Sequence, residues 1–176
     1  MGFESVGENT EISRKVSIYG VSGRIGARTR IDDFCILKGR LEIGSCVHIA
    51  AYVAMGGHRN YPITCKDCSA VSSHSSIFTG TADYRAAAIS NPTVEEDMQA
   101  NIFGPVTFEE GVVVGAHCVV LPNVVIWYGT SIGANLVLHR SIEPGKIIAS
   151  RHGRPEVVGE RDVAAIARLV DRARTL

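Results

Sequence analysis

The sequence predicts a parallel β-helix, an all-β coil in which short strands stack around a narrow prism, and three observations indicate it. Bulky, mostly aliphatic residues recur every six positions along much of the 176-residue chain. A small or apolar residue usually stands four places after each of them. Glycine is abundant, at 18 residues, whereas tryptophan occurs once. A period of six fits neither an ordinary strand nor an amphipathic helix, but it is typical of short strands joined by tight corners.

The six-residue period falls into three blocks. The anchors are Ile25, Ile31, Leu37, Ile43, Ile49 and Met55, then Cys65, Val71 and Ile77, then Phe108, Val114, Val120, Ile126, Ile132 and Leu138. A four-residue slip separates the first two blocks, and a longer break separates the last two. Three such hexads complete one turn of the prism, so these fifteen anchors predict about five coils.

Residues 82–105 break the period with an acidic stretch, a proline and polar turn residues. A connection of this length in a compact domain is usually functional, so we expect a long loop beside the active site. We expect one β-helix domain over residues 1–158, with this loop inserted.

The last segment has a different period. Val163, Ile166 and Val170 stand at helical spacing, which predicts an amphipathic helix within residues 159–176. We expect this helix to pack on the β-helix domain and to cap the open end of the prism, as terminal elements do in repeat proteins.

Composition excludes several classes of protein. The 18 basic and 18 acidic residues balance, so no nucleic-acid partner is indicated. No apolar run is long enough for a membrane span, and no apolar leader follows Met1. The five cysteines form an odd set, and Cys65 and Cys68 lack a second pair at zinc spacing. We therefore expect a cytoplasmic protein without a metal. Phosphate-binding and serine-hydrolase glycine motifs are also missing.

Two runs, IGSCVHIAAYVAMGG and the stretch from VVVGAHCVVLPNVVI to SRHGRP, resemble the hexapeptide-repeat acyltransferases. The resemblance covers roughly residues 16–158. It implies a left-handed β-helix and a homotrimer that binds acetyl-CoA, as a cosubstrate, in clefts between subunits. It also implies transfer of the acetyl group to an amine or hydroxyl. The runs HSSIFTGTADY, NPTV and GPVTF are most similar to members that act on sugars in surface-polysaccharide pathways, such as lipopolysaccharide biosynthesis, which favours a nucleotide-linked sugar as acceptor.

The chain departs from the sugar and maltose O-acetyltransferases of this family at two positions. Ala82 stands where those enzymes have a catalytic histidine, and Tyr52 stands where they have its partner asparagine. Because an uncharged amine needs less help from a base than a hydroxyl does, the missing pair favours transfer to nitrogen. The same absence favours an alternative, a noncatalytic trimeric scaffold or binding protein.

The positions of residues in successive coils indicate other catalytic residues in place of the missing pair. His58 is predicted to lie one coil, roughly 5 Å, from the root of the long loop, which carries Asp83. A carboxylate beside an imidazole orients the ring and stabilises its charged form. We therefore predict His58 as the general base, assisted by Asp83.

A second column of corner residues offers another base. Tyr52, His74, His117 and Asn135 are predicted to stack along one corner, with His74 and His117 as the alternative catalytic bases. Two histidines in one column also leave open a zinc enzyme of the γ-carbonic anhydrase type, although the closely paired histidines of that class are missing.

A neutral chain must bind the anionic coenzyme through local cations and free amides. The resemblance places the pantetheine arm beside small residues of the closing coils and the nucleotide beside basic residues near the end of the coil. The basic residue that usually follows the G-x-P motif is absent, since Val157 occupies its place. The predicted coenzyme-binding set is Ala116, Ala134, His139, Arg140, Arg151 and Arg154.

Overall fold

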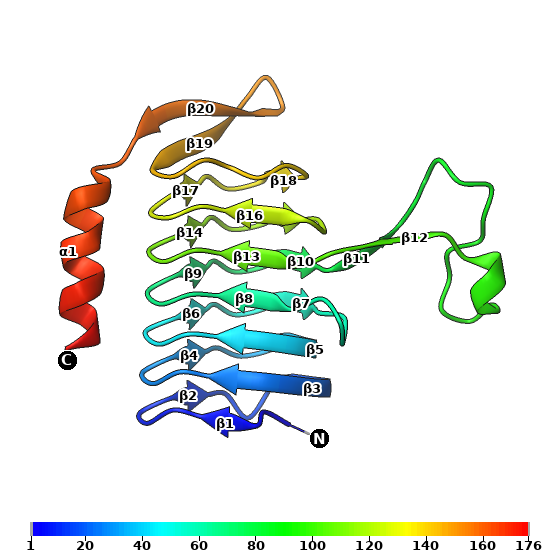
Figure 1. The fold of residues 1–176 in the computed structure, drawn as a ribbon, viewed down its shortest axis with the longest axis horizontal. Helices are drawn as coiled ribbons and strands as arrows, with labels where there is room; N and C mark the ends of the chain where they lie inside the picture. Colours follow the sequence, from blue (N-terminus) through cyan, green and yellow to red (C-terminus); the bar gives the residue numbers. More distant parts are fainter. Residues whose placement is uncertain (1, 176) are drawn as a thin grey trace.

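A computed structural model, which describes residues 2–175, shows a three-sided prism of stacked strands with one arm and one helix outside it (Figure 1). Face 1 contains β1 (Ser5–Val6), the second halves of β3 (Ser17–Ile25) and β5 (Ile36–Ile43), β8 (Ile63–Cys65), β13 (Val106–Phe108) and β16 (Val124–Ile126). Neighbouring strands on this face pair in parallel.

The other two faces are built in the same way. Face 2 contains β2 (Glu11–Ile12), β4 (Arg30–Ile31), β6 (His48–Ile49), β9 (Ala70–Val71), β14 (Val113–Val114), β17 (Ser131–Ile132) and β19 (Lys146–Arg151). Face 3 contains the first halves of β3 and β5, then β7 (Ala54–Gly56), β10 (Ser76–Phe78), β15 (Val119–Val120) and β18 (Val137–Leu138). The predicted parallel β-helix is confirmed.

The predicted number of coils was too small. Face 2 alone stacks seven parallel strands, from β2 to β19, whereas fifteen hexads predicted about five coils. The additional coils lie before Ile25 and after Leu138, where the six-residue pattern is irregular. The reason is that the end coils bury their side chains less completely, so they depend less on a regular series of bulky residues: Phe3, Ile12 and Ile142 are only partly buried.

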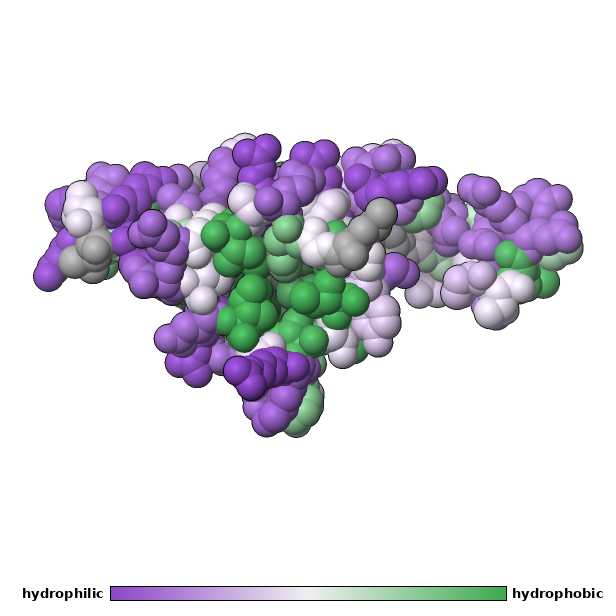
Figure 2. Space-filling model, turned by 90° about the horizontal axis from the view of Figure 1, so that it is seen from below, coloured by the Kyte–Doolittle hydropathy of each residue, from purple (hydrophilic) through white to green (hydrophobic). Residues whose placement is uncertain are grey.

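The interior of the prism is the hydrophobic core. All fifteen predicted anchors are at most 4% exposed. Most positions four residues later are buried as well, but Arg59, Thr81 and Ile142 are not. At Thr81 the chain leaves the prism, and Thr79 is fully buried in its place. At the N-terminal base the core is open, and apolar side chains gather there between polar rims (Figure 2).

Three corners join the faces, and each carries one feature. The helix corner, between faces 1 and 2, holds Arg28, Cys46, Cys68, Gly111, Gly129 and Gly145 in successive coils. The ring corner, between faces 2 and 3, holds Phe34, Tyr52, His74, His117 and Asn135. All of these residues have positive φ. At many corners a residue other than glycine therefore adopts the left-handed conformation, which is energetically unfavourable for it. The loop corner, between faces 3 and 1, carries the long arm.

The arm is the predicted loop. It leaves the prism as an antiparallel ribbon of β11 (Gly80–Ala82) and β12 (Asn101–Phe103) and includes the short 3-10 helix η1 (Glu96–Met98). Figure 1 shows the ribbon projecting far to the side of the prism. It starts from the corner between β10 and β13, and it is not part of the stacked coils.

The C-terminal helix α1 (Val163–Arg174) confirms the predicted helix but not its place. It lies along the helix corner instead of capping the open end (Figure 1). Glycines make room for it there, since a Cβ on Gly111 would stand 2.7 Å from Cγ2 of Ile166. Ile166 and Val170 are its buried residues. No helix within residues 2–175 has the length and apolarity to cross a bilayer.

Polar contacts fasten both ends of α1. Arg161 donates through Nη1 to the carbonyl oxygens of Gly111 and Gly129, at 3.1 and 2.9 Å. Arg174 pairs with Asp67 and Glu110 on the prism. Before the helix, β20 (Arg154–Glu160) pairs antiparallel with β19. The predicted boundary between residues 158 and 159 therefore falls inside β20.

Candidate functional site

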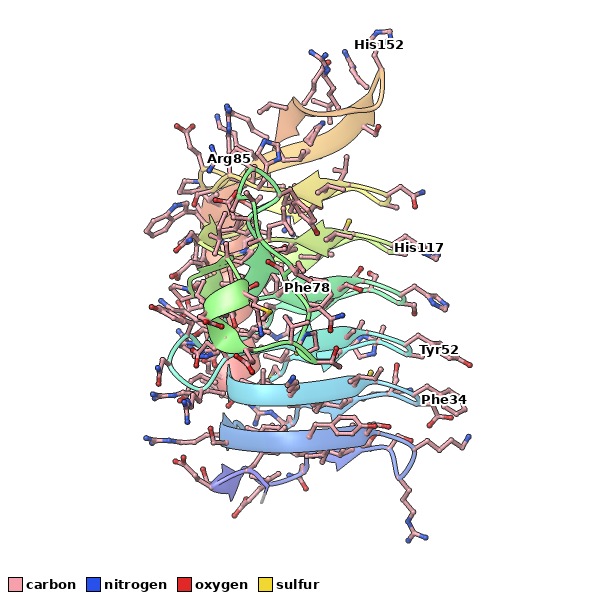
Figure 3. The ribbon with its side chains drawn as sticks, turned by 90° about the vertical axis from the view of Figure 1, so that its right-hand side faces the viewer. Phe34, Tyr52, Phe78, Arg85, His117 and His152 are labelled. Atoms are coloured by element: carbon pink, nitrogen blue, oxygen red, sulfur yellow. The ribbon has the colours of Figure 1, made fainter. Side chains whose placement is uncertain are left out.

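The ring corner forms a continuous stack of flat side chains. Ring centroids lie 5.0 Å apart for Phe34 and Tyr52, 4.7 Å for Tyr52 and His74, and 4.9 Å for His74 and His117. Figure 3 shows Phe34, Tyr52 and His117 projecting from the same edge of the prism. The predicted column is confirmed. Its first member, Phe34, was missed, although it stands 18 residues, or one coil, before Tyr52.

This stacking argues against the zinc alternative. The rings of His74 and His117 are parallel to within 2°. Imidazole lone pairs lie in the ring planes, so two parallel stacked rings do not direct their nitrogens at one ion. Within residues 2–175 no three histidine, cysteine or acidic residues cluster in a way that could hold a metal.

A cleft of about 430 Å³ lies between the loop corner and the ribbon, and it is here called the loop cleft. Such a volume is typical of small-molecule sites. His58 and Ala82 both line it, so the predicted base and the vacant histidine position face the same space. The lining residues are Lys38, Gly56, Gly57, His58, Phe78, Gly80, Thr81, Ala82, Ser90, Asn91, Pro92, Gln99, Asn101 and Phe103.

Hydrogen bonds hold His58 in one orientation. Its backbone N–H donates to Oγ1 of the buried Thr79 at 2.6 Å, and its ring Nδ1 accepts from the backbone N–H of Asn60 at 3.2 Å. Its ring also packs 4.8 Å from the ring of Phe103. Because Nδ1 is an acceptor, the neutral imidazole carries its proton on Nε2. In this state His58 is a hydrogen-bond donor through Nε2.

Asp83 is engaged elsewhere. Its Oδ1 accepts from the backbone N–H of Arg85 at 3.0 Å and from Nε of Arg85 at 3.3 Å. The bond from the backbone N–H and the neighbouring guanidinium lower the pKa of the Asp83 carboxyl. The carboxylate is thus held by Arg85, and it makes no hydrogen bond to His58. The predicted His58–Asp83 pair is not formed.

An imidazole–carboxylate pair does occur on face 2. His48 Nε2 lies 2.9 Å from Oδ2 of Asp32, and Arg30 Nε donates to Oδ1 of Asp32 at 2.6 Å. Burial opposes ionisation of Asp32, but hydrogen bonds from His48 and Arg30 outweigh it and lower the pKa of the carboxyl. This pair lies outside the loop cleft, and it joins His48 of one coil to Asp32 of the coil before it.

Four of the predicted coenzyme-binding residues gather at the end of the coil. His139 and Arg140 line a second, smaller cleft of about 190 Å³, the closing-coil cleft, together with Pro155 of β20. Arg151 and Arg154 face each other across the β19–β20 pair, next to Pro155. Figure 3 shows His152 at the tip of this hairpin. The basic end of the chain therefore borders one cleft.

The other two predicted coenzyme-binding residues lie on a different corner. Ala116 and Ala134 adjoin the ring corner, where the backbone N–H of Asn135 donates to the carbonyl oxygen of Ala116 at 2.9 Å. Strand β18 separates this corner from His139 and Arg140. Within one protomer, Ala116 and Ala134 thus lie at a different corner from His139 and Arg140, while Arg151 and Arg154 lie at the end of the β19–β20 pair.

Sequence reasoning missed most side chains of the loop cleft, among them Phe103 and Lys38. Phe103 was passed over although it is 42% exposed in a chain with few aromatic residues. Lys38 was missed because it belongs to a strand, and only the register of β5 against β7 places it beside Gly56. The signal available in the sequence for Phe103 was an aromatic residue near the end of the aperiodic segment, in a chain with five phenylalanines.

Comparisons with known proteins identify the family. No family model matches the chain. The dTDP-4-amino-4,6-dideoxy-D-glucose acyltransferase of Escherichia coli is 37% identical over 147 residues, which cover 81% of this chain and 76% of that protein. The chain belongs to the hexapeptide-repeat acyltransferases. It is therefore an acyltransferase, and the predicted alternative of a noncatalytic scaffold is not supported.

Solved structures of this acyltransferase family give the same fold over the whole chain. A variant of AntD, an N-acyltransferase from Bacillus cereus, in complex with dTDP-4-amino-4,6-dideoxyglucose and coenzyme A matches with a TM-score of 0.89 at 31% identity, covering 99% of this chain and 92% of that one. AntD in complex with dTDP and 3-hydroxybutyryl-CoA matches with a TM-score of 0.87 at 33% identity, covering 99% and 93%.

Proposed function

We propose that this protein transfers an acyl group from a coenzyme A thioester to the amine of a dTDP-linked 4-amino-4,6-dideoxyglucose. One observation carries the proposal: a relative named for this acceptor is 37% identical to the chain over 147 residues. AntD, which was crystallised with this sugar nucleotide and coenzyme A, supports it with the same fold along the whole chain. The acyl group is acetyl or a short relative of it, since AntD was also crystallised with 3-hydroxybutyryl-CoA.

The reaction fits a site that lacks the usual histidine at Ala82. The lone pair of the sugar amine attacks the thioester carbonyl, a C–N bond forms, and the C–S bond breaks. The coenzyme leaves as a thiolate, and the nitrogen loses one proton. Because a neutral amine is a better nucleophile than a neutral hydroxyl, its attack does not require prior deprotonation. His74 on the ring corner remains a candidate proton acceptor, whereas His58 in the state described above donates through Nε2.

The closing-coil cleft is the proposed coenzyme site. Arg140, Arg151 and Arg154 supply positive charge for its phosphates, in a chain whose total charge is zero. Ala116 and Ala134 offer small surfaces at the opposite edge of face 3. A homotrimer reconciles the two positions, because the ring corner of one copy then faces the closing coils of the next.

Exposed apolar side chains support the homotrimer. Ile36 on face 3 is 48% exposed, Tyr52 on the ring corner is 50% exposed, and Val137 on face 3 is 52% exposed. A row of such side chains along one edge is typical of a surface that another protein covers. We also place the enzyme in the cytoplasm and in surface-glycan synthesis, since both proposed substrates are phosphorylated and do not cross a bilayer unaided.

The function is tested with the purified chain, acetyl-CoA or 3-hydroxybutyryl-CoA, and dTDP-4-amino-4,6-dideoxyglucose, with mass spectrometry of the sugar nucleotide. We expect a mass gain of one acyl group and release of one coenzyme A per acylated sugar. dTDP-glucose, with a hydroxyl at the same carbon, is the matched control and should stay unmodified. Acylation of neither compound, or equal acylation of both, would contradict transfer to this amine.

A further inference from the structure

The lining of the loop cleft contains a cation but no carboxylate. None of its lining residues is acidic, and Lys38 is its one lysine or arginine. The arm itself is acidic, but Glu95, Glu96 and Asp97 lie outside the lining. Lys38 forms no ion pair with any residue of the described chain. An unneutralised cation in a cleft without carboxylates favours a ligand with a negatively charged end, such as a diphosphate.

Two phenylalanine rings lie against glycine backbone in this cleft. A Cβ on Gly80 would come within 2.7 Å of the Phe103 ring, and a Cβ on Gly56 within 2.9 Å of the Phe78 ring. The two glycines pair directly with these phenylalanines across the ribbon and across face 3. Each ring therefore has one side packed on backbone, and Phe103 is still 42% exposed. A flat, partly open ring suits stacking with a planar base.

A chain of amides on the arm has its orientation set by the backbone. Gln99 donates through Nε2 to the carbonyl oxygen of Val94 at 3.0 Å, which directs its Oε1 toward Asn101. Asn101 donates through Nδ2 to that Oε1 at 3.1 Å. The remaining group, Oδ1 of Asn101, accepts no hydrogen bond from the described residues. It is an acceptor available to a ligand of the cleft.

A second amide has the opposite polarity. Oδ1 of Asn91 accepts from the backbone N–H of Thr93 at 3.0 Å and from its hydroxyl at 2.8 Å. This leaves Nδ2 of Asn91 as a donor that makes no hydrogen bond within residues 2–175. The cleft therefore presents a donor from Asn91 and an acceptor from Asn101 on the same arm.

From these features we propose that the loop cleft binds the pyrimidine nucleoside diphosphate part of the substrate and selects a base with an imide edge. Thymine and uracil present C=O, N–H and C=O in sequence, which matches the donor of Asn91 and the acceptor of Asn101. With the Asn91 donor at the C4 carbonyl and the Asn101 acceptor at N3–H, cytosine reverses both contacts, because it has an amino group at C4 and an unprotonated N3. Phe103 stacks on the base, and Lys38 with the Nε2–H of His58 faces the diphosphate.

This inference rests on the proposed function for the identity of the acceptor, but its test needs no acyl transfer. Calorimetric titration of the full chain with dTDP, UDP and dCDP measures the base preference directly. We expect dTDP and UDP to bind with similar affinity, and dCDP to bind roughly 10- to 100-fold more weakly, as for other paired base contacts. Equal affinity for dCDP and dTDP would overturn the proposal.

Two variants test whether the arm causes the preference for dTDP over dCDP. Asn101→Ala should bind dTDP about 10-fold more weakly and lose most of its preference over dCDP. Glu96→Gln, on the same arm but outside the cleft, should leave both affinities unchanged. A full dTDP preference in a folded Asn101→Ala protein would refute the role of the arm. If acylation fails while the base preference holds, the proposed function is wrong and this site stands; if acylation occurs without the preference, only this site is wrong.

Discussion

At the scale of single residues, one hydrogen bond changes the role expected of His58. The sequence places this histidine beside the root of the arm, and the structure confirms that neighbourhood. The predicted partner Asp83, however, is held by Arg85, and the N–H of Asn60 occupies the ring nitrogen that a base would use on that side. Which ring nitrogen carries the proton, more than the position of the ring, separates a base from a donor.

The first prediction separates these roles. If His58 donates through Nε2, then His58→Gln, which keeps an N–H donor, should retain kcat within about 3-fold, and His58→Ala should mainly raise KM for the sugar nucleotide, by about 10-fold. A general base would behave differently, since both variants would then lose about 10²- to 10⁴-fold in kcat. Steady-state kinetics between pH 6 and 9 measure both constants. A large kcat loss in His58→Gln would restore the predicted base.

At the scale of elements, local sequence signals determine where helix α1 begins, and packing determines where it docks. Asp162 caps its first turn by accepting from the backbone N–H of Ala165 at 2.9 Å. The periodic Ile166 and Val170 then face the prism. Where the helix docks depends on Gly111 and Gly129, which lie far away in the sequence and leave space on one corner.

The second prediction concerns this cap. Asp162→Ala removes an acceptor from the first helical turn and should destabilise α1 by about 1 kcal/mol, whereas Asp162→Asn, an equally good cap, should be close to neutral. Hydrogen exchange of the amides of Ile166 and Val170 reports this local stability. Equal protection in the two variants would show that packing on the prism, not the cap, holds the start of the helix.

At the scale of the whole molecule, stacking makes each coil depend on its neighbours. Phe108 is the largest fully buried side chain, and its strand β13 lies between β8 and β16 at the point where the arm returns to the prism. Its ring therefore joins the coils before the arm to the coils after it. In a repeat fold, a defect at such a junction weakens two interfaces at once.

The third prediction follows from this position. Phe108→Ala should lower the free energy of unfolding by about 3–5 kcal/mol, because it leaves a cavity in a fully buried site. Phe103→Ala is the matched control, since its ring lies on the arm and is 42% exposed. It should cost little stability and should instead weaken dTDP binding. Urea unfolding followed by circular dichroism compares the two, and equal destabilisation would contradict this division.

Periodicity explains how much of the fold was predictable. Every hexad anchor from Ile25 to Leu138 is buried, because a six-residue step returns a side chain to the interior whichever face it lies on. The same step predicted the ring stack from Tyr52 to His117. The pairing of His58 with Asp83 was not predictable, since the arm has no period and its turns are set by local hydrogen bonds such as those of Arg85.

The sequence by itself determined the prism, the arm and the helix, and it indicated the acyltransferase family, because each follows from spacing or from local motifs. Tertiary structure alone decided three other matters. It put α1 on the side of the prism, divided the predicted coenzyme residues between two corners, and brought Lys38, Phe103 and Asn101 into one cleft. The physical reason is that strand register and the path of the ribbon place these residues together, and both depend on backbone pairing across many coils.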